Sequence, residues 1–109
     1  MEFTNTKNGD KLVVAVTGRL DAVTAPEFDT QCKSWLNDGE NRIIADLSNL
    51  EYISSAGLRS ILSAAKQLKT AKGEIIFCGL NGMVEEVFTV SGFASMFAMY
   101  PTLDDALAG

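Results

Sequence analysis

The 109-residue sequence contains no histidine and only two cysteines. Without an imidazole, Ser-His-Asp and Cys-His catalysis, histidine-ligated zinc and HExxH chemistry are excluded. The cysteines, Cys32 and Cys78, form no CxxC pair and lie in apolar segments, so we expect two buried, reduced thiols. No metal site and no cofactor is expected.

Basic residues are few and long apolar runs are absent. Nine Lys and Arg against fourteen Asp and Glu leave a net charge of −5, which argues against a nucleic-acid surface. No apolar run approaches the roughly 18–20 residues that cross a bilayer. The first residues lack the basic start and apolar stretch of a signal peptide. We therefore expect a cytoplasmic protein with neither a nucleic-acid nor a membrane partner.

Hydrophobic residues make up 47% of the chain, enough for one core. The length predicts a single domain, residues 1–109, and a monomer. The periodicity alternates between strand-like and helix-like segments. Strands are expected at residues 3–6, 11–17, 42–47, 74–78 and 97–100, and helices at 24–37, from 56 to before 73, at 81–90 and briefly at 102–107. This alternation predicts an α/β fold: a mixed four- to five-stranded sheet, with an antiparallel first hairpin, packed with three to four helices.

Loops that leave the carboxyl ends of parallel strands gather at one edge of a sheet, where ligands and partners usually bind. Three loops meet that condition here, at residues 18–21, 48–55 and 79–82, with 48–55 read as a polar connection. None contains GxGxxG or GxxxxGK[ST], and acidic residues do not cluster in them. The sequence therefore predicts a protein that is not an enzyme.

The sequence Ser54-Ser55-Ala56-Gly57-Leu58 begins the second expected helix. A serine before an apolar helical stripe is typical of an N-cap. Gly57 weakens a helix, yet it removes a side chain beside the serine hydroxyl, and this would let another protein approach closely.

Across nearly its whole length the chain resembles STAS domains of the bacterial anti-sigma-factor antagonist type. Gly18-Arg19-Leu20-Asp21 matches the family's element after the second strand, and Asp46-Leu47-Ser48-x-Leu50-x-Tyr52-Ile53 matches its central strand and loop. Residues 54–58 fall on the family's Asp-Ser-Ser/Thr-Gly-Leu, with Ser54 in place of the acid and Ala56 in place of the second hydroxyl.

The resemblance implies that Ser55 is the phosphoacceptor, with Ser54 as the alternative. Asp21 then occupies the position of an acidic residue near the partner surface. On the outer face of the second helix, Arg59 and Ser63 are further contact candidates. The partner-binding residues predicted in this way are Asp21, Ser54, Ser55, Gly57, Arg59 and Ser63.

The resemblance also implies a function by partner exchange. The unphosphorylated protein would bind an anti-sigma factor that is also a serine kinase of the GHKL type, and so release the sigma factor. Phosphorylation would separate the complex, and a PP2C-type phosphatase would restore the active form. The protein itself would catalyse nothing.

Three other interpretations stay open. The chain could be a STAS accessory subunit that binds the ATPase of an ABC-type lipid transport system, where Ser55 would be a contact and not a switch. A phosphocarrier enzyme fits less well, because such carriers typically use histidine or cysteine. In a plain interaction domain, Ser55 would only cap its helix.

Overall fold

The computed structural model describes all residues from 1 to 109. Six strands and five helices follow one another along the chain. In order they are β1 (Glu2–Asn8), β2 (Lys11–Leu20), α1 (Ala25–Asn37), β3 (Arg42–Asp46), β4 (Leu50–Ile53), α2 (Ser55–Thr70), β5 (Glu74–Cys78), α3 (Gly82–Val90), α4 (Phe93–Met96), β6 (Met99–Tyr100) and α5 (Leu103–Ala108).

The strands form one mixed sheet in the order β1-β2-β3-β5-β6, with β4 beside the end of β2. Only β1 and β2 pair antiparallel, across a turn in which Gly9 has a φ of +62°. All other pairs are parallel. The α/β class, the opening hairpin and the parallel later strands are confirmed.

β4 is the strand that the sequence analysis missed, because it lies in the segment expected to be a polar connection. Leu50 and Ile53 are only 3% and 2% exposed, and β4 pairs in parallel with the last residues of β2. The first part of β2 pairs instead with β3. The helix α4 is the other element that was not expected.

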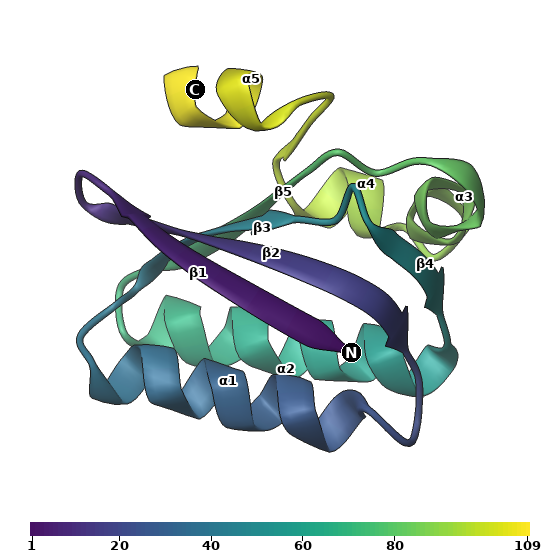
Figure 1. Cartoon of the computed structure of the whole chain (residues 1–109), viewed down its shortest axis with the longest axis horizontal. Coiled ribbons are helices and arrows are strands. Elements are labelled where there is room, and N and C mark those ends of the chain that lie inside the picture. Colours follow the sequence, from purple (N-terminus) through teal and green to yellow (C-terminus); the bar gives the residue numbers. More distant parts are fainter.

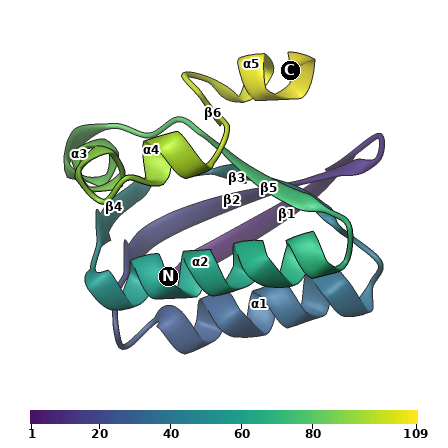
Figure 2. The same ribbon diagram turned by 180° about the vertical axis from the view of Figure 1, so that it is seen from behind.

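Two layers of helices enclose the sheet (Figures 1 and 2). α1 and α2 lie side by side on one face, α5 lies on the other, and α3 and α4 lie near one end. The main core is a cluster of 20 buried residues, whereas the second cluster has four: Val13, Ile44, Cys78 and Ala106. Neighbouring strand residues such as Ile43 and Ile44 belong to different clusters, because side chains alternate between the faces of a sheet.

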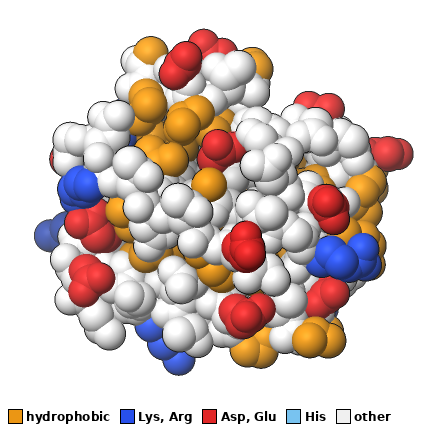
Figure 3. Space-filling view, viewed as in Figure 1, with side chains coloured by type: hydrophobic (Ala, Val, Ile, Leu, Met, Phe, Trp, Pro, Cys, Tyr) orange, Lys and Arg blue, Asp and Glu red, His pale blue; other side chains and the backbone are white.

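Both cysteines are fully buried free thiols, as expected. Burial raises the pKa of Cys32, and it raises the pKa of Cys78 to about 11. No helix has the length and hydrophobicity to span a membrane. Figure 3 shows acidic side chains spread singly over the face that carries β1, and hydrophobic atoms gathered below the lobe formed by α5.

Candidate functional site

The ends of β2 and β4 and the start of α2 meet at one corner of the molecule (Figure 1). The register pairs Arg19 with Tyr52 and Leu20 with Ile53. The N–H of Ser54 then donates to the carbonyl of Leu20, at 3.0 Å. This hydrogen bond fixes the chain where it leaves β4 and enters α2.

Ser54 is the N-cap of α2. Its backbone is extended, with φ −102° and ψ 175°, and its hydroxyl accepts from the N–H of Gly57 at 3.3 Å. The helix therefore begins at Ser55. The interpretation in which Ser55 caps the helix is wrong, because its neighbour already holds that position.

Ser55 is exposed at the first position of the helix, and its hydroxyl has no hydrogen-bond partner within the chain. The first turn of α2 contains no acidic side chain. The 16-residue helix directs free backbone N–H groups and the positive end of its dipole toward this corner. An anionic group on Ser55 would therefore meet a favourable field.

Gly57 is buried, and the expectation that it clears space for another protein is wrong. A Cβ at this position would lie 2.6 Å from the carbonyl oxygen of Leu20 and 2.9 Å from a side-chain carbon of Ile53. The missing side chain lets α2 approach the ends of β2 and β4. Gly57 thus lets the helix pack closely and so positions the serines.

Asp21 organises the loop that follows β2. Its Oδ1 accepts from the N–H groups of Val23 and Thr24, at 3.0 and 3.1 Å. These hydrogen bonds, the one from Thr24 first, lower the pKa of Asp21. The Thr24 hydroxyl donates to the carbonyl of Arg19, at 2.8 Å, and makes no side-chain cap of α1. Asp21 is half-buried at the predicted corner, where it shapes the loop beside the serines.

Arg19 and Val23 also lie at this corner, and the sequence analysis predicted neither of them as a partner-binding residue. The Arg19 guanidinium stacks over the Tyr52 ring, 4.2 Å from its centroid, and its Nε lies 3.9 Å from an Asp21 oxygen. Val23 is 84% exposed. A valine within an otherwise small and polar loop was the only signal in the sequence for an exposed apolar contact.

Arg59 and Ser63 lie on the exposed side of α2, as expected. Arg59 forms no ion pair, and the Ser63 hydroxyl accepts from Gln67 at 3.2 Å. They extend the corner along the helix by one and two turns from Ser55. The structure thus places Asp21, Ser54 and Ser55 around the start of α2, with Gly57 beneath them and Arg59 and Ser63 beyond.

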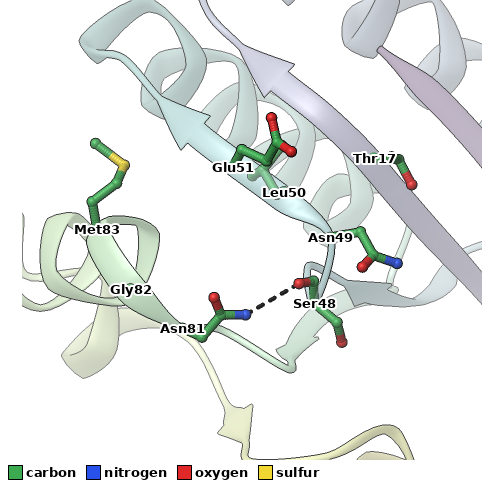
Figure 4. A pocket seen from close by; sticks show the side chains of 8 residues that line it. All are labelled: Thr17, Ser48, Asn49, Leu50, Glu51, Asn81, Gly82 and Met83. Atoms are coloured by element: carbon green, nitrogen blue, oxygen red, sulfur yellow. Dashed lines mark hydrogen bonds between the residues drawn. The ribbon is translucent and has the colours of Figure 1, made fainter.

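The other loops predicted at this edge form a separate polar pocket of about 350 Å³ (Figure 4). Asn81 donates through Nδ2 to the carbonyl of Ser48, at 3.1 Å, and so joins the start of α3 to the loop before β4. Glu51 is the only carboxylate that lines the pocket, and no group of three potential metal ligands exists in the chain. The pocket therefore holds no pair of acid and base that would carry out catalysis.

Comparisons with known proteins find similar sequences and folds. The family model for the STAS domain matches residues 2–106. The BtrV protein of Bordetella bronchiseptica, named as an anti-sigma factor antagonist, is 37% identical over 108 residues, which cover 99% of this chain and 93% of that protein.

Solved structures show the same fold. A Thermotoga maritima protein described as an anti-sigma factor antagonist superposes with a TM-score of 0.91 at 24% identity, over 97% of this chain and 92% of that one. The phosphorylated form of the Bacillus protein SpoIIAA superposes with a TM-score of 0.74 at 19% identity, over 98% and 97% of the two chains.

Proposed function

The chain belongs to the STAS domain family, and on that premise we propose that it is an anti-sigma-factor antagonist controlled by phosphorylation of Ser55. In its unphosphorylated form it binds an anti-sigma factor that is also a serine kinase of the GHKL type, and this binding frees a sigma factor in the cytoplasm. A PP2C-type phosphatase reverses the modification. The names of the relatives support the first part of this proposal.

One observation carries the choice of residue: two adjacent serines have different structural roles. The Ser54 oxygen is engaged as the helix cap, and the residue is half-buried. Ser55 is exposed, and its hydroxyl is not used by the fold. A kinase can therefore modify Ser55 without disturbing the start of the helix, whereas modification of Ser54 would cost the cap hydrogen bond.

The chemistry of the switch is a phosphoryl transfer in which this chain is the substrate. The Ser55 oxygen attacks the γ-phosphorus of ATP, an O–P bond forms, the bond to the β-phosphate oxygen breaks, and ADP leaves. The hydroxyl proton passes to a base of the kinase. In the reverse direction, water hydrolyses the phosphoserine to serine and inorganic phosphate.

Phosphorylation adds about −1.5 to −2 charges and three acceptor oxygens. At the first position of α2 these oxygens face free N–H groups and the positive end of the helix dipole, so the fold tolerates them. A partner that had covered this corner would now have to desolvate a dianion near its nucleotide. A loss of a few kcal/mol lowers the affinity at least about a hundredfold.

The test is phosphorylation by a cognate GHKL kinase, with ATP and intact-mass detection. We expect one phosphate on the wild type and on Ser54→Ala, and none on Ser55→Ala. Thr30→Ala, which removes an exposed hydroxyl on α1, is the matched control and should still accept one phosphate. Labelling that persists in Ser55→Ala would refute the assignment.

A binding measurement tests the second half of the proposal. Ser55→Asp should keep the thermal midpoint of the wild type and lose most of its affinity for the unphosphorylated kinase. Binding as tight as that of the wild type would contradict the electrostatic account. Co-purification with an ABC ATPase, and with no sigma-factor regulator, would instead favour the transport subunit.

A further inference from the structure

A groove of about 450 Å³ lies away from the serine corner, toward the other end of α2. Its apolar lining is formed by Leu62 and Ala65 of α2, Ile75 and Ile76 of β5, Met96 at the end of α4, and Phe97 and Ala98 after that helix. Figure 2 shows α2 and α4 on the side nearer the viewer, with β5 behind them. Met96 is 56% exposed, which is unusual for so large an apolar side chain. We call this surface the β5-edge groove.

The backbone of β5 is paired only in part on this side. β6 pairs with Phe77 and Cys78 and goes no further, and the N–H of Phe77 donates to the carbonyl of Ala98 at 3.1 Å. In a strand of a parallel sheet, each residue directs its own N–H and C=O groups to the same side, and successive residues alternate between the two sides. Ile75 therefore directs both groups toward this edge, where no strand lies beside it.

The alternation is fixed by the hydrogen bonds to β3. The N–H of Glu74 donates to the carbonyl of Asn41, just before β3, at 2.8 Å. The carbonyl of Cys78 accepts from the N–H of Leu47, just after β3, at 3.0 Å. Residues 74, 76 and 78 thus face β3, and 75 and 77 face the open edge. Ile75 lines the groove and is only 4% exposed. An unpaired strand edge of this kind is a template for another strand.

The rim of the groove is basic in a chain whose net charge is −5. Lys66 and Lys69 line it, and neither forms an ion pair. The one carboxylate in the lining, Glu74, lies 3.5 Å from a nitrogen of Arg42. The free charge of the groove is therefore positive and fits a segment with acidic side chains.

We propose that the β5-edge groove binds an extended segment of a partner protein as an added strand beside β5. The segment places an apolar side chain among Leu62, Met96 and Phe97, exchanges backbone hydrogen bonds with Ile75, and carries acidic residues toward the two lysines. Strand addition of this kind obtains affinity from the backbone and specificity from the side-chain pockets.

A second copy of this chain fits the groove less well. The strand at the opposite edge of its sheet, β1, has the sequence Glu-Phe-Thr-Asn-Thr-Lys-Asn, in which Phe3 is the only apolar residue. The Phe3 ring already packs near that of Phe28, with centroids 6.3 Å apart. β1 therefore offers no free apolar side chain for the groove.

This site does not depend on the proposed function. On α2 the groove is lined from Leu62 to Lys69, which lie 7 to 14 residues beyond Ser55, or about 10 to 21 Å along the helix axis at 1.5 Å per residue. A segment held there leaves the serine corner free to bind and to be phosphorylated.

The experiment is an NMR titration of the whole, isotope-labelled chain with a blocked synthetic peptide, Glu-Thr-Val-Ile-Val-Thr-Glu. We expect amide shifts confined to residues 73–76, 96–98 and the second half of α2, and exchange of the Ile75 amide with solvent slowed at least about tenfold at saturation. Two further copies of the peptide carry N-methyl groups on the odd or the even amides. Only one of the two should lose binding, because an added strand directs alternate amides to its partner.

Charge reversal supplies the second readout. A peptide with lysine in place of both glutamates should bind about tenfold more weakly, and Lys66→Glu with Lys69→Glu should invert that preference. Lys33→Glu, on the exposed side of α1, is the matched control and should leave both affinities unchanged. Ser55→Asp should also leave them unchanged, so this result is separable from the proposed switch.

Three outcomes would overturn the proposal. The first is a titration to millimolar peptide that does not shift the Ile75 amide. The second is equal behaviour of the two methylated copies. The third is a shift of the same amides on raising the protein concentration alone, with a doubled mass in sedimentation, because the groove would then bind a second copy.

Discussion

The two ends of α2 are built in opposite ways. At the amino end the N–H of Ser54 is paired with Leu20, the cap is in place, and Gly57 leaves no spare room against Leu20. Toward the carboxyl end a groove of about 450 Å³ lies beside a partly unpaired strand, with two lysines that form no ion pair. The amino end is tightly packed, and it exposes the Ser55 hydroxyl. The carboxyl end is open, and it offers the unpaired backbone groups of Ile75 and the charges of Lys66 and Lys69 to a bound segment.

This difference fits two separate roles along one helix, phosphorylation at its amino end and binding of an added strand toward its carboxyl end. A group that a kinase must find in a fixed geometry benefits from rigid surroundings, because misplacement by about 1 Å can cost a hundredfold in rate. A surface that accepts an added strand needs free backbone groups, and tight packing would remove them. Substitutions at the two ends of α2 test how rigid the amino end is and how little the fold uses the groove.

The largest effect is expected for Gly57→Val. Its Cβ would lie 2.6 Å from a backbone oxygen that cannot rotate away, so we expect the free energy of unfolding to fall by about 3 kcal/mol, the upper end for overpacking. Urea denaturation measures this. Ser55→Val adds a similar side chain two positions earlier on the exposed side, and it should cost only a few tenths of a kcal/mol. Equal costs would mean that the amino end is not tightly packed.

A smaller effect separates the two serines. Ser54→Ala removes the side-chain cap and should lower the free energy of unfolding by about 1 kcal/mol. Ser55→Ala removes a hydroxyl with no partner and should change it by less than about 0.5 kcal/mol. Thermal and urea unfolding of the two variants side by side give the comparison. A reversed order would assign the cap to Ser55 and weaken the case for its modification.

The sequence predicted elements whose signals are local. The Asn-Gly turn, the apolar run of β2 and the helical stripe that includes Ile61 and Leu68 each lie within one short segment, and each appears in the structure as expected. The family resemblance then identified the loop with the two serines. Fold class and the location of the site followed from these patterns.

Features that depend on distant partners could not be predicted. The four residues of β4 show no periodicity, and they are a strand because the end of β2 lies beside them. Two adjacent serines are equally good caps by sequence, and the hydrogen bond from Ser54 to Leu20 helps decide between them. Ser60, a polar residue next to the exposed Arg59, is 7% exposed, which only the packed structure reveals.

The next effect depends on pH. Hydrogen bonds from Thr24 and Val23 lower the pKa of Asp21 below its usual 3.8. A carboxylate with a lowered pKa in the folded state adds stability above its unfolded pKa, and this stability is lost as the pH falls through the folded value. Asp21→Asn should thus be less stable than the wild type at neutral pH, and the difference should shrink below about pH 4.

Asp10→Asn is the matched control for Asp21→Asn. The pKa of Asp10 is lowered by its hydrogen bond with Arg42, at 2.6 Å, so its variant should show the same direction with pH. Asp10 lies at the turn between β1 and β2, away from the serine corner. Kinase binding should therefore weaken in Asp21→Asn alone, and equal weakening in both would remove Asp21 from the partner surface.

The smallest effect is expected at the open end. Lys66→Gln and Lys69→Gln remove charges that have no carboxylate partner, so the cost is limited to their interaction with the carboxyl end of the helix dipole, a few tenths of a kcal/mol. Urea unfolding of the double variant should stay within about 0.5 kcal/mol of the wild type. A loss as large as that of Ser54→Ala would mean that the fold itself uses these charges. The two ends of α2 would then differ less than their geometry indicates, and the lysines would not be free for an acidic partner.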